Sequence, residues 1–416
     1  METLNVFFGQ VSVGTLTLNQ DRSFSFQYDK NWLILPDGFQ LSVSLPMQES
    51  AITGTHVRAF FANLLPEAMA RNRVARCLGI SENNDFMLLK QIGGDCAGAI
   101  SILPEREHPK TPQHYAYTLM TDTQLAEAIR QIPVRPLFAG EEGIRISLAG
   151  AQQKLALFNK DGRFYIPLND APSNCIVKPA IQGFEDSIEN EHFCMCLAHD
   201  LKLPVPRTEI LTRYKQKGLI IQRYDREMKN GTTVRLHQED FCQAMGLSHE
   251  VKYLADGGPS IKDCFRVVRD YSANPVKDMQ LLLQWVFYNF LIGNMDAHAK
   301  NLSFLYYMRQ IRLAPFYDLI CTEVYEGLSK KMAMKIGTEY RPNWTRERHW
   351  ERLADDINIS RNVLRKHLEA FCTRVIHALD PAVRQFSLKY GENDLVLSIS
   401  NRIRKRASGT LKLILK

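Results

Sequence analysis

The chain has 416 residues, of which 45% are hydrophobic and 23% charged, so it can bury more than one core and lacks the composition of a disordered protein. Its net charge of +7 is a mild basic excess for this length. The nine cysteines include no C-x-x-C pair and the N-terminus shows no signal peptide, so we expect reduced thiols and a cytoplasmic protein.

The first part of the chain is expected to form a small sheet with one long helix. Apolar and polar side chains alternate over 4–28, which predicts short antiparallel strands joined by turns. A helix is expected over 55–77, and a glycine-punctuated strand region over 92–103. Pro104 and the polar stretch after it place a boundary near residue 110, so the first predicted domain is 1–110.

The next predicted domain, 111–225, is rich in strands and carries one helix. Strands are expected over 154–159, 163–167 and 174–179, a helix over 188–201, and further strands through Tyr224. Together they predict a lobe of five strands and one helix.

The last predicted domain, 226–416, is mainly helical. Its longest apolar run, 281–292, contains Gln284 and Asn289 and is shorter than the roughly 20 residues that a bilayer span needs. We therefore expect a buried helix and no membrane contact. A sheet-rich lobe followed by a helical lobe is the order found in two-lobed kinases, although this order alone is a weak indicator.

The strongest chemical signal is an Asp and an Asn five positions apart, directly after the predicted buried helix. Phosphoryl transfer needs a carboxylate that accepts the proton of the attacking hydroxyl and a neutral oxygen ligand for Mg²⁺ on the same loop. Asp296 and Asn301 fit these two roles. His298 lies between them and is expected to donate a hydrogen bond to the transferred phosphate.

A predicted hairpin follows this loop. Two strands, 302–307 and 311–314, are joined by a turn at Met308, Arg309 and Gln310. They lead to Asp318, which lies 22 positions beyond Asp296 and follows an aromatic residue. This is the kinase order of catalytic loop, hairpin and metal-binding Asp, so Asp318 is predicted to be the second magnesium ligand.

Lys178 stands at the end of an apolar strand, where a buried cation needs an anionic partner. ATP phosphates are one such partner. A carboxylate on the following helix is another, and Glu191 is the expected residue, with Glu189 as the alternative. A strand-end lysine that extends outward to solvent is the simpler interpretation of the residue taken alone.

Neither a Walker sequence nor G-x-G-x-x-G occurs, so a phosphate loop must be built differently. The candidate is 143–154, whose small residues let backbone N–H groups approach a phosphate. A tight turn before a strand is the alternative for this segment.

Basic residues gather near the C-terminus, where the last sixteen positions carry no acidic residue. The members of this group are Arg402, Arg404, Lys405, Arg406, Lys412 and Lys416. A solvated basic tail is one interpretation, and contact with DNA phosphates through Arg402, Arg404, Lys405 and Arg406 is the other.

Several separated motifs recur in one order that resembles the HipA family of bacterial serine/threonine kinase toxins. They are 60–66, 92–104, 145–152, 238–240, 252–259, 296–301 and 315–318. The resemblance implies an α+β, two-lobed protein-kinase-like fold with an added N-terminal β-rich subdomain and a mainly helical C-terminal lobe.

The resemblance also implies the residues that bind ATP and Mg²⁺. They are Ala149, Gly150, Ala151, Gln152, Gln153, Lys154, Lys178, Gln222, Tyr224, His298, Lys300, Asn301, Tyr317 and Asp318. Gln222 stands at the expected hinge where the best-known relatives have Glu, which puts a side-chain contact to adenine in doubt. Ser147 matches the family serine that becomes autophosphorylated.

The implied function is that of an ATP-dependent serine/threonine protein kinase toxin. Its implied partners are a HipB-like helix-turn-helix antitoxin, promoter DNA bound by the pair as corepressor, and a translation-related protein substrate such as an aminoacyl-tRNA synthetase. An aminoglycoside-type or lipid kinase would share Asp296, His298, Asn301 and Asp318. A catalytically idle, DNA-bound corepressor is the alternative from a different class.

Overall fold

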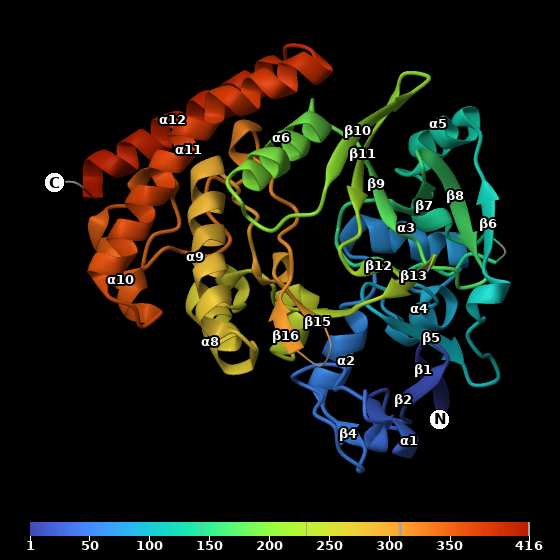
Figure 1. The fold of residues 1–416 in the computed structure, drawn as a ribbon. Coiled ribbons are helices and arrows are strands. Elements are labelled where there is room, and N and C mark those ends of the chain that lie inside the picture. The colour runs from blue at the N-terminus through green and yellow to red at the C-terminus, as the bar shows by residue number, and fades with distance from the viewer. Residues whose placement is uncertain (142, 230, 308–309, 415–416) are drawn as a thin grey trace. The chain divides into compact units, whose positions relative to one another are not determined.

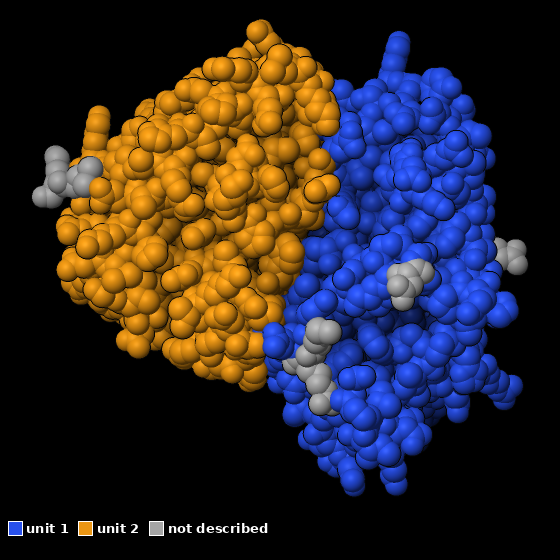
Figure 2. Space-filling model, viewed as in Figure 1, with its two compact units in different colours: residues 1–180, 209–250, 304–311 blue, residues 181–208, 251–303, 312–416 orange. Residues whose placement is uncertain are grey.

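The computed structural model describes residues 1–141, 143–229, 231–307 and 310–414. The chain forms two compact units, each made of several stretches of sequence (Figure 2). Unit 1 comprises 1–180, 209–250 and 304–311, and unit 2 comprises 181–208, 251–303 and 312–416. The predicted division into three domains, with boundaries at residues 110 and 225, differs from these two units and stays a prediction.

Unit 1 begins with an antiparallel five-stranded sheet in the order β4-β3-β2-β1-β5 (Figure 1). Its strands are β1 (Glu2–Phe8), β2 (Val11–Leu18), β3 (Phe24–Tyr28), β4 (Ile52–Thr53) and β5 (Ile100–Pro104). Leu4, Val6, Leu16 and Phe26 are fully buried at alternate positions. The strands predicted over 4–28 are therefore confirmed, because one face of the sheet packs on a core.

The helices of this first part differ from the prediction. They are α1 (Lys30–Ile34), α2 (Thr55–Ala62), α3 (Ala68–Leu78) and α4 (Asp85–Ile92). The single helix expected over 55–77 is wrong, because Pro66 disfavours helical backbone at the residue before it and separates α2 from α3. The strand region expected over 92–103 is also too long. It forms a turn before β5, and α4 ends at Ile92.

The second sheet of unit 1 has six strands in the order β10-β11-β9-β7-β8-β6. They are β6 (Ala116–Leu119), β7 (Leu155–Lys160), β8 (Arg163–Leu168), β9 (Cys175–Pro179), β10 (Thr208–Arg213) and β11 (Gln216–Gln222). The three strands predicted over 154–179 are confirmed. β6 and the helix α5 (Asp122–Gln131), which packs against β9 and β11, were not expected.

Short elements complete unit 1 and carry the chain between the units. They are β12 (Arg226–Lys229), β13 (Thr232–Arg235), β14 (His237–Asp240), α7 (Phe241–Ala244), β15 (Ser303–Tyr307) and β16 (Gln310–Leu313). The predicted pair of strands after the candidate catalytic loop is confirmed as β15 and β16. Met308 and Arg309 of the predicted turn lie outside the described residues. β14 is a further strand, not expected, in the part of the chain (226–416) that was predicted to be mainly helical.

Unit 2 is mainly helical. Its helices are α6 (Ser187–Asp200), α8 (Ile261–Tyr271), α9 (Pro275–Ile292), α10 (Glu347–Asp356), α11 (Arg361–Tyr390) and α12 (Asp394–Ile414). The predicted buried helix is confirmed as α9, in which Leu282, Trp285, Phe287 and Leu291 are buried and which packs against α8, α11 and α12. Among the described helices, none combines the length and apolar character that a bilayer span requires.

Single-turn 3₁₀ helices join these elements. They are η1 (Pro112–His114), η2 (Pro136–Phe138), η3 (His249–Val251), η4 (Leu254–Asp256), η5 (Ala299–Asn301), η6 (Thr322–Val324) and η7 (Pro342–Trp344). Two of them, η5 and η6, belong to the loops that carry the candidate catalytic residues.

Candidate active site

The candidate catalytic loop begins where α9 ends. Gly293 caps the helix with a left-handed backbone (φ 75°), which glycine adopts without a steric cost. The next residue, Asn294, holds the loop in place through its side-chain amide. Its Nδ2 donates to Asn289 Oδ1 (2.8 Å) and to the backbone oxygen of Asp318 (3.1 Å), and its Oδ1 accepts the N–H of Asp296 (3.1 Å). One amide therefore connects the helix end, the predicted base and the predicted metal loop.

Asp296, the predicted base, is exposed. Its Oδ1 accepts a hydrogen bond of 2.8 Å from the hydroxyl of Tyr253. The tyrosine ring in turn meets the imidazole of His298 edge to face, with the ring centroids 5.1 Å apart. Tyr253 therefore orients the carboxylate. The sequence interpretation gave it no role, because a contact between residues 43 positions apart leaves no local pattern.

The two predicted magnesium ligands meet, although they are 17 positions apart. Asn301 Nδ2 lies 3.3 Å from Oδ2 of Asp318. Two adjacent ligands of an octahedral magnesium ion lie about 3 Å from each other, because each Mg–O bond is about 2.1 Å long. Turning the Asn301 amide over would present its oxygen at the position of its nitrogen, and would give up the hydrogen bond that Oδ1 accepts from the N–H of His298 (3.1 Å). The pair therefore fits a magnesium site.

The backbone around the two ligands is held by further hydrogen bonds. Oδ1 of Asn301 accepts the N–H of His298 (3.1 Å). The hydroxyl of Tyr317 lies 2.7 Å from the backbone oxygen of Lys300 and 2.7 Å from the hydroxyl of Ser303. Asp318 has a left-handed backbone (φ 54°), which is uncommon outside glycine and which Asp and Asn tolerate best. Such conformations concentrate at functional sites.

His298, Lys300 and Asn301 are all buried in this loop. The structure therefore brings together Asp296, His298, Lys300, Asn301, Tyr317 and Asp318, which are the predicted catalytic, nucleotide-binding and metal-binding residues that lie in unit 2.

In unit 1, the candidate phosphate loop is closed on itself and tied to the first subdomain. Lys154 Nζ donates to the backbone oxygen of Ala149 (2.5 Å), so the two ends of 149–154 meet. Gly150 has φ 107°, a conformation that other residues rarely adopt, and it forms a bridge with Pro66. The backbone oxygen of Gly150 also accepts the N–H of Glu67 (3.1 Å).

Ser147 is fully buried. Its hydroxyl donates to the backbone oxygen of Leu64 (2.7 Å), and its N–H donates to the backbone oxygen of Asp95 (3.0 Å). The hydroxyl thus anchors the segment to the first subdomain.

Lys178 is buried in β9, opposite Leu219 of β11. The helix α6 of unit 2 carries Glu189 and Glu191, both buried, and the pairing of Lys178 with Glu191 stays a prediction. Gln222 ends β11 and is exposed.

Comparison with known proteins decides the family. A family model described as HipA-like C-terminal domain matches residues 146–379, and one described as HipA N-terminal domain matches residues 4–103. The protein Y4mE of Sinorhizobium fredii, which is named as a kinase, is 35% identical over 412 residues, covering 98% of both chains. The chain belongs to the HipA family.

Two further comparisons concern HipA of Shewanella oneidensis. The serine/threonine-protein kinase toxin HipA of that organism is 31% identical over 398 residues, covering 91% of this chain and 88% of the relative. A solved structure of Shewanella HipA, in a complex with HipB and operator DNA, superposes with a TM-score of 0.87 at 28% identity, covering 99% and 98% of the two chains. The expected α+β, kinase-like fold is therefore confirmed.

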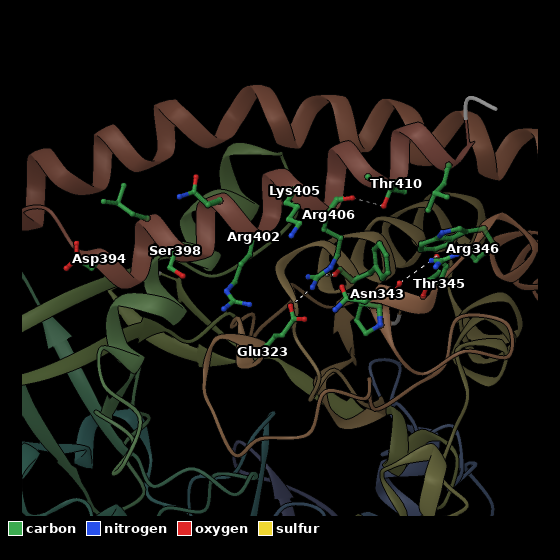
Figure 3. A pocket seen from close by; sticks show the side chains of 17 residues that line it. Glu323, Asn343, Thr345, Arg346, Asp394, Ser398, Arg402, Lys405, Arg406 and Thr410 are labelled. Atoms are coloured by element: carbon green, nitrogen blue, oxygen red, sulfur yellow. Dashed lines mark hydrogen bonds and ion pairs between the residues drawn. The ribbon is translucent and has the colours of Figure 1, made fainter.

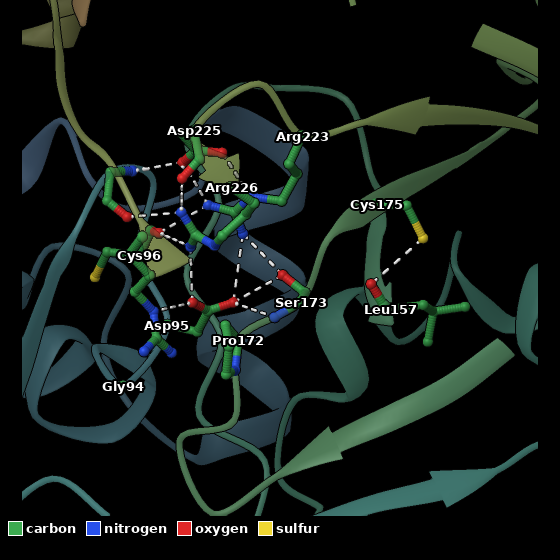
Figure 4. Close-up of polar contacts among 12 residues, drawn as sticks. Gly94, Asp95, Cys96, Leu157, Pro172, Ser173, Cys175, Arg223, Asp225 and Arg226 are labelled. Carbon is green, nitrogen blue, oxygen red and sulfur yellow. Dashed lines mark hydrogen bonds and ion pairs between the residues drawn. The ribbon is translucent and has the colours of Figure 1, made fainter. Parts of the chain in front are cut away.

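This HipA-family chain carries a buried ion network directly after the expected hinge residue Gln222, which the sequence interpretation missed (Figure 4). Asp95 accepts from Arg226 (2.8 Å), Arg235 (2.9 Å) and Arg223 (3.3 Å). Asp225 pairs with Arg223 (2.7 Å) and Arg226 (2.8 Å). Burial acts to raise the pKa of Asp95, but the three guanidinium groups outweigh it and hold that pKa well below its usual range.

The network joins two segments that are far apart in sequence. Asp95 belongs to the 92–104 motif of the first subdomain, and Arg223 to Arg226 follow Gln222 directly. Tyr224 lies between Arg223 and Asp225 in the sequence, and its hydroxyl donates to the side chain of Gln238. The segment after Gln222 is therefore fixed to the first subdomain, because breaking a buried ion pair leaves an uncompensated charge.

The four basic side chains predicted to contact DNA do not form one uniform surface on this HipA-family chain. Arg406 is nine-tenths buried and pairs with Glu323, and Arg404 pairs with Asp380 of α11. Arg402 and Lys405 are exposed and line a groove beside α12 (Figure 3).

Proposed function

We propose that this HipA-family chain is an ATP-dependent serine/threonine protein kinase that acts as the toxin of a toxin–antitoxin pair. The observation that carries the proposal is the hydrogen-bonded cluster of Asp296, Asn301 and Asp318, connected by Asn294. A base and two adjacent hard-oxygen ligands are what phosphoryl transfer requires.

In the proposed reaction, the hydroxyl oxygen of a substrate serine or threonine forms a bond to the γ-phosphorus of ATP. The bond from that phosphorus to the β–γ bridging oxygen breaks, and the hydroxyl proton passes to Asp296. Tyr253 fixes the orientation of the carboxylate through its 2.8 Å hydrogen bond. Magnesium held by Asn301 and Asp318 would supply positive charge beside the phosphates.

We propose that the residues of unit 1 bind the nucleotide phosphates and adenine. The backbone of Ala149 to Gln153 would donate N–H groups to phosphate oxygens, with Lys154 and Lys178 as the cations. Gln222 and Tyr224 would line the adenine end. His298, Lys300 and Tyr317 would complete the nucleotide contacts.

Autophosphorylation of Ser147 is part of the proposal. A phosphate would add nearly two negative charges at a fully buried hydroxyl, and the site could not hold them without moving. The segment 145–150 would then leave its position against Leu64 and Asp95. The modification would therefore switch the kinase off.

The proposed partners are a HipB-like helix-turn-helix antitoxin and promoter DNA, bound by the complex as corepressor. The Shewanella structure was solved with HipB and operator DNA, which supports this assignment at 28% sequence identity. The proposed acceptor is a translation-related protein in the cytoplasm, such as an aminoacyl-tRNA synthetase.

The test is transfer of label from γ-³²P-ATP and Mg²⁺, comparing the wild-type chain with Asp296→Asn. A cell extract, an aminoglycoside and phospholipid vesicles are offered as acceptors in separate reactions. Label on protein serine or threonine, including the chain itself, is the expected result. Label on the aminoglycoside or lipid alone would indicate another class of kinase, and no label at all would favour an idle corepressor.

A further inference from the structure

One face of α12 borders a groove of about 810 Å³ in unit 2 (Figure 3). The α12 residues along it are Asp394, Leu397, Ser398, Asn401, Arg402, Lys405, Arg406, Gly409, Thr410 and Leu413. Their spacing of three and four positions places them on one side of the helix. Another face of α12, with Val396, Ile399, Ile403 and Ala407, is buried. The opposite wall of the groove includes Pro342, Asn343 and Arg346.

The middle of the groove is positively charged. Lys405 and Arg406 lie three and four positions after Arg402, a spacing at which like charges repel. Glu323 neutralises Arg406. Neither Arg402 nor Lys405 has an ion pair or hydrogen bond within the part of the chain that the structure describes. Two cations on one face thus lack a partner, and Arg346 adds a third basic group from the opposite wall.

The ends of the groove differ from its middle. Leu397 and Leu413 line it and are 41% and 36% exposed, so each offers an apolar contact to a ligand. Asp394, at the α12 N-terminal end, is the acidic group besides Glu323 among the lining residues. From Asp394 to Leu413 the helix rises roughly 28 Å, which an extended peptide spans with about eight residues.

We propose that this groove binds an extended acidic peptide segment of a partner protein. Carboxylates in the middle of the segment would lie against Arg402 and Lys405, and apolar side chains at its ends would contact Leu397 and Leu413. Length, charge and apolar ends together favour a peptide over a DNA backbone, since phosphates gain nothing from two exposed leucines. The proposal goes beyond the kinase assignment and does not depend on it.

The probe is a fluorescein-labelled peptide of about eight residues with leucine at each end and glutamate between, a length set by the extended rise per residue. A peptide with glutamine at every glutamate position is its control. Binding to the full chain is measured by fluorescence anisotropy without ATP, so a failure of the kinase assignment leaves the result unaffected.

The matched variants remove two charges each from the same helix. Arg402→Gln with Lys405→Gln changes the groove. Arg404→Gln with Lys412→Gln is the control, because these two side chains do not line it. The wild-type chain is expected to bind the glutamate peptide. Its affinity should be at least about tenfold weaker for the glutamine peptide, and the groove variant should bind the glutamate peptide at least about tenfold more weakly than the wild type, as electrostatic pairing at partly enclosed sites predicts. The control variant should lose about twofold or less. Circular dichroism checks that both variants fold.

Three outcomes would overturn the proposal. They are no binding of the glutamate peptide, equal binding of the two peptides, and equal losses in the two double variants. A duplex oligonucleotide that binds through Arg402 and Lys405, while the peptide does not, would assign this face to DNA instead.

Discussion

Arg406 of α12 and Glu323 form an ion pair that lies against Gly293, the residue at which the candidate catalytic loop begins. Arg406 Nη1 donates to the backbone oxygens of Phe290 (3.2 Å) and Leu291 (3.1 Å), at the C-terminal end of α9. The N–H of Glu323 donates to the backbone oxygen of Gly293 (3.0 Å). A Cβ atom on Gly293 would lie 2.8 Å from Glu323 Oε2 and 3.0 Å from Arg406 Nη1. The ion pair therefore supports the loop at the point where it leaves α9.

Arg406→Ala is expected to lower kcat about tenfold or more while changing KM for ATP little, because Arg406 contacts the backbone before the loop and is not among the residues predicted to bind ATP. Removing one partner of a nearly buried pair should also cost about 3 kcal/mol of stability. Arg406→Lys should restore part of kcat, since it keeps the charge. Arg404→Ala, on the same helix, is the control. An unchanged kcat in a folded Arg406→Ala variant would show that the pair is only structural.

Asp296→Asn is expected to abolish phosphoryl transfer, by at least about 100-fold, because it removes the proton acceptor. Folding and ATP binding should persist, since Tyr253 can still donate to the amide oxygen of the variant. Single-turnover label transfer and equilibrium nucleotide binding separate the two effects. Near-normal transfer in this variant would refute the assignment of the base.

Asp318→Asn is expected to weaken Mg-ATP binding by about tenfold or more, since a neutral amide replaces a charged ligand. The variant should fold, because Asn tolerates the left-handed backbone that Asp318 adopts. Raising the Mg²⁺ concentration should recover part of the binding. Affinity that does not depend on Mg²⁺ in either protein would remove Asp318 from the metal site.

Ser147 should gain one phosphate when the wild-type chain is incubated with Mg-ATP, and none in Asp296→Asn. Nucleotide binding should be lost in the modified fraction, because like charges would repel ATP and the buried segment would be expelled. Ser147→Ala should still bind ATP, with a modest loss of stability from its hydrogen bond to Leu64. Mass spectrometry and nucleotide binding test this. Full modification with undiminished binding would contradict the switch.

Glu239 should make stability depend on pH. Burial raises its pKa to about 7, although hydrogen bonds from Ser42, Tyr306 and Val43 act in the opposite direction. Between the unfolded value of 4.5 and about 7, the folded state holds a proton that the unfolded state has lost. The free energy of unfolding therefore falls by roughly 2–4 kcal/mol as the pH rises from 4.5 to about 7. Outside this range the contribution of Glu239 to stability does not change with pH.

Glu239→Gln should remove this part of the pH dependence, because a neutral amide replaces the carboxyl group. Its stability relative to wild type should be higher at pH 8 than at pH 4.5, as urea unfolding at the two values can measure. If the difference in free energy of unfolding between wild type and variant is the same at pH 4.5 and pH 8, the pKa of Glu239 lies near its ordinary value.

The sequence by itself determined the parts of this protein that depend on local pattern. The apolar run 281–292 predicted α9, and the alternation over 4–28 predicted the first strands, because periodicity reports which face of an element is buried. The spacing of Asp296 and Asn301, and the strand pair before Asp318, predicted residues that the fold does bring together. Local prediction failed at Pro66, where one proline divides the expected helix.

Only the tertiary structure decided which distant groups support these residues. Tyr253 reaches Asp296, Asn294 reaches the backbone of Asp318, and Arg406 reaches Gly293 from a helix more than 100 positions away. No periodicity marks such contacts, since they depend on how whole elements pack. The same packing divides the expected basic tail into paired and unpaired side chains. Arg406 and Arg404 form ion pairs with carboxylates, while Arg402 and Lys405 form none among the described residues. The sequence shows which residues are charged, but only the fold decides with which oppositely charged residue each of them pairs.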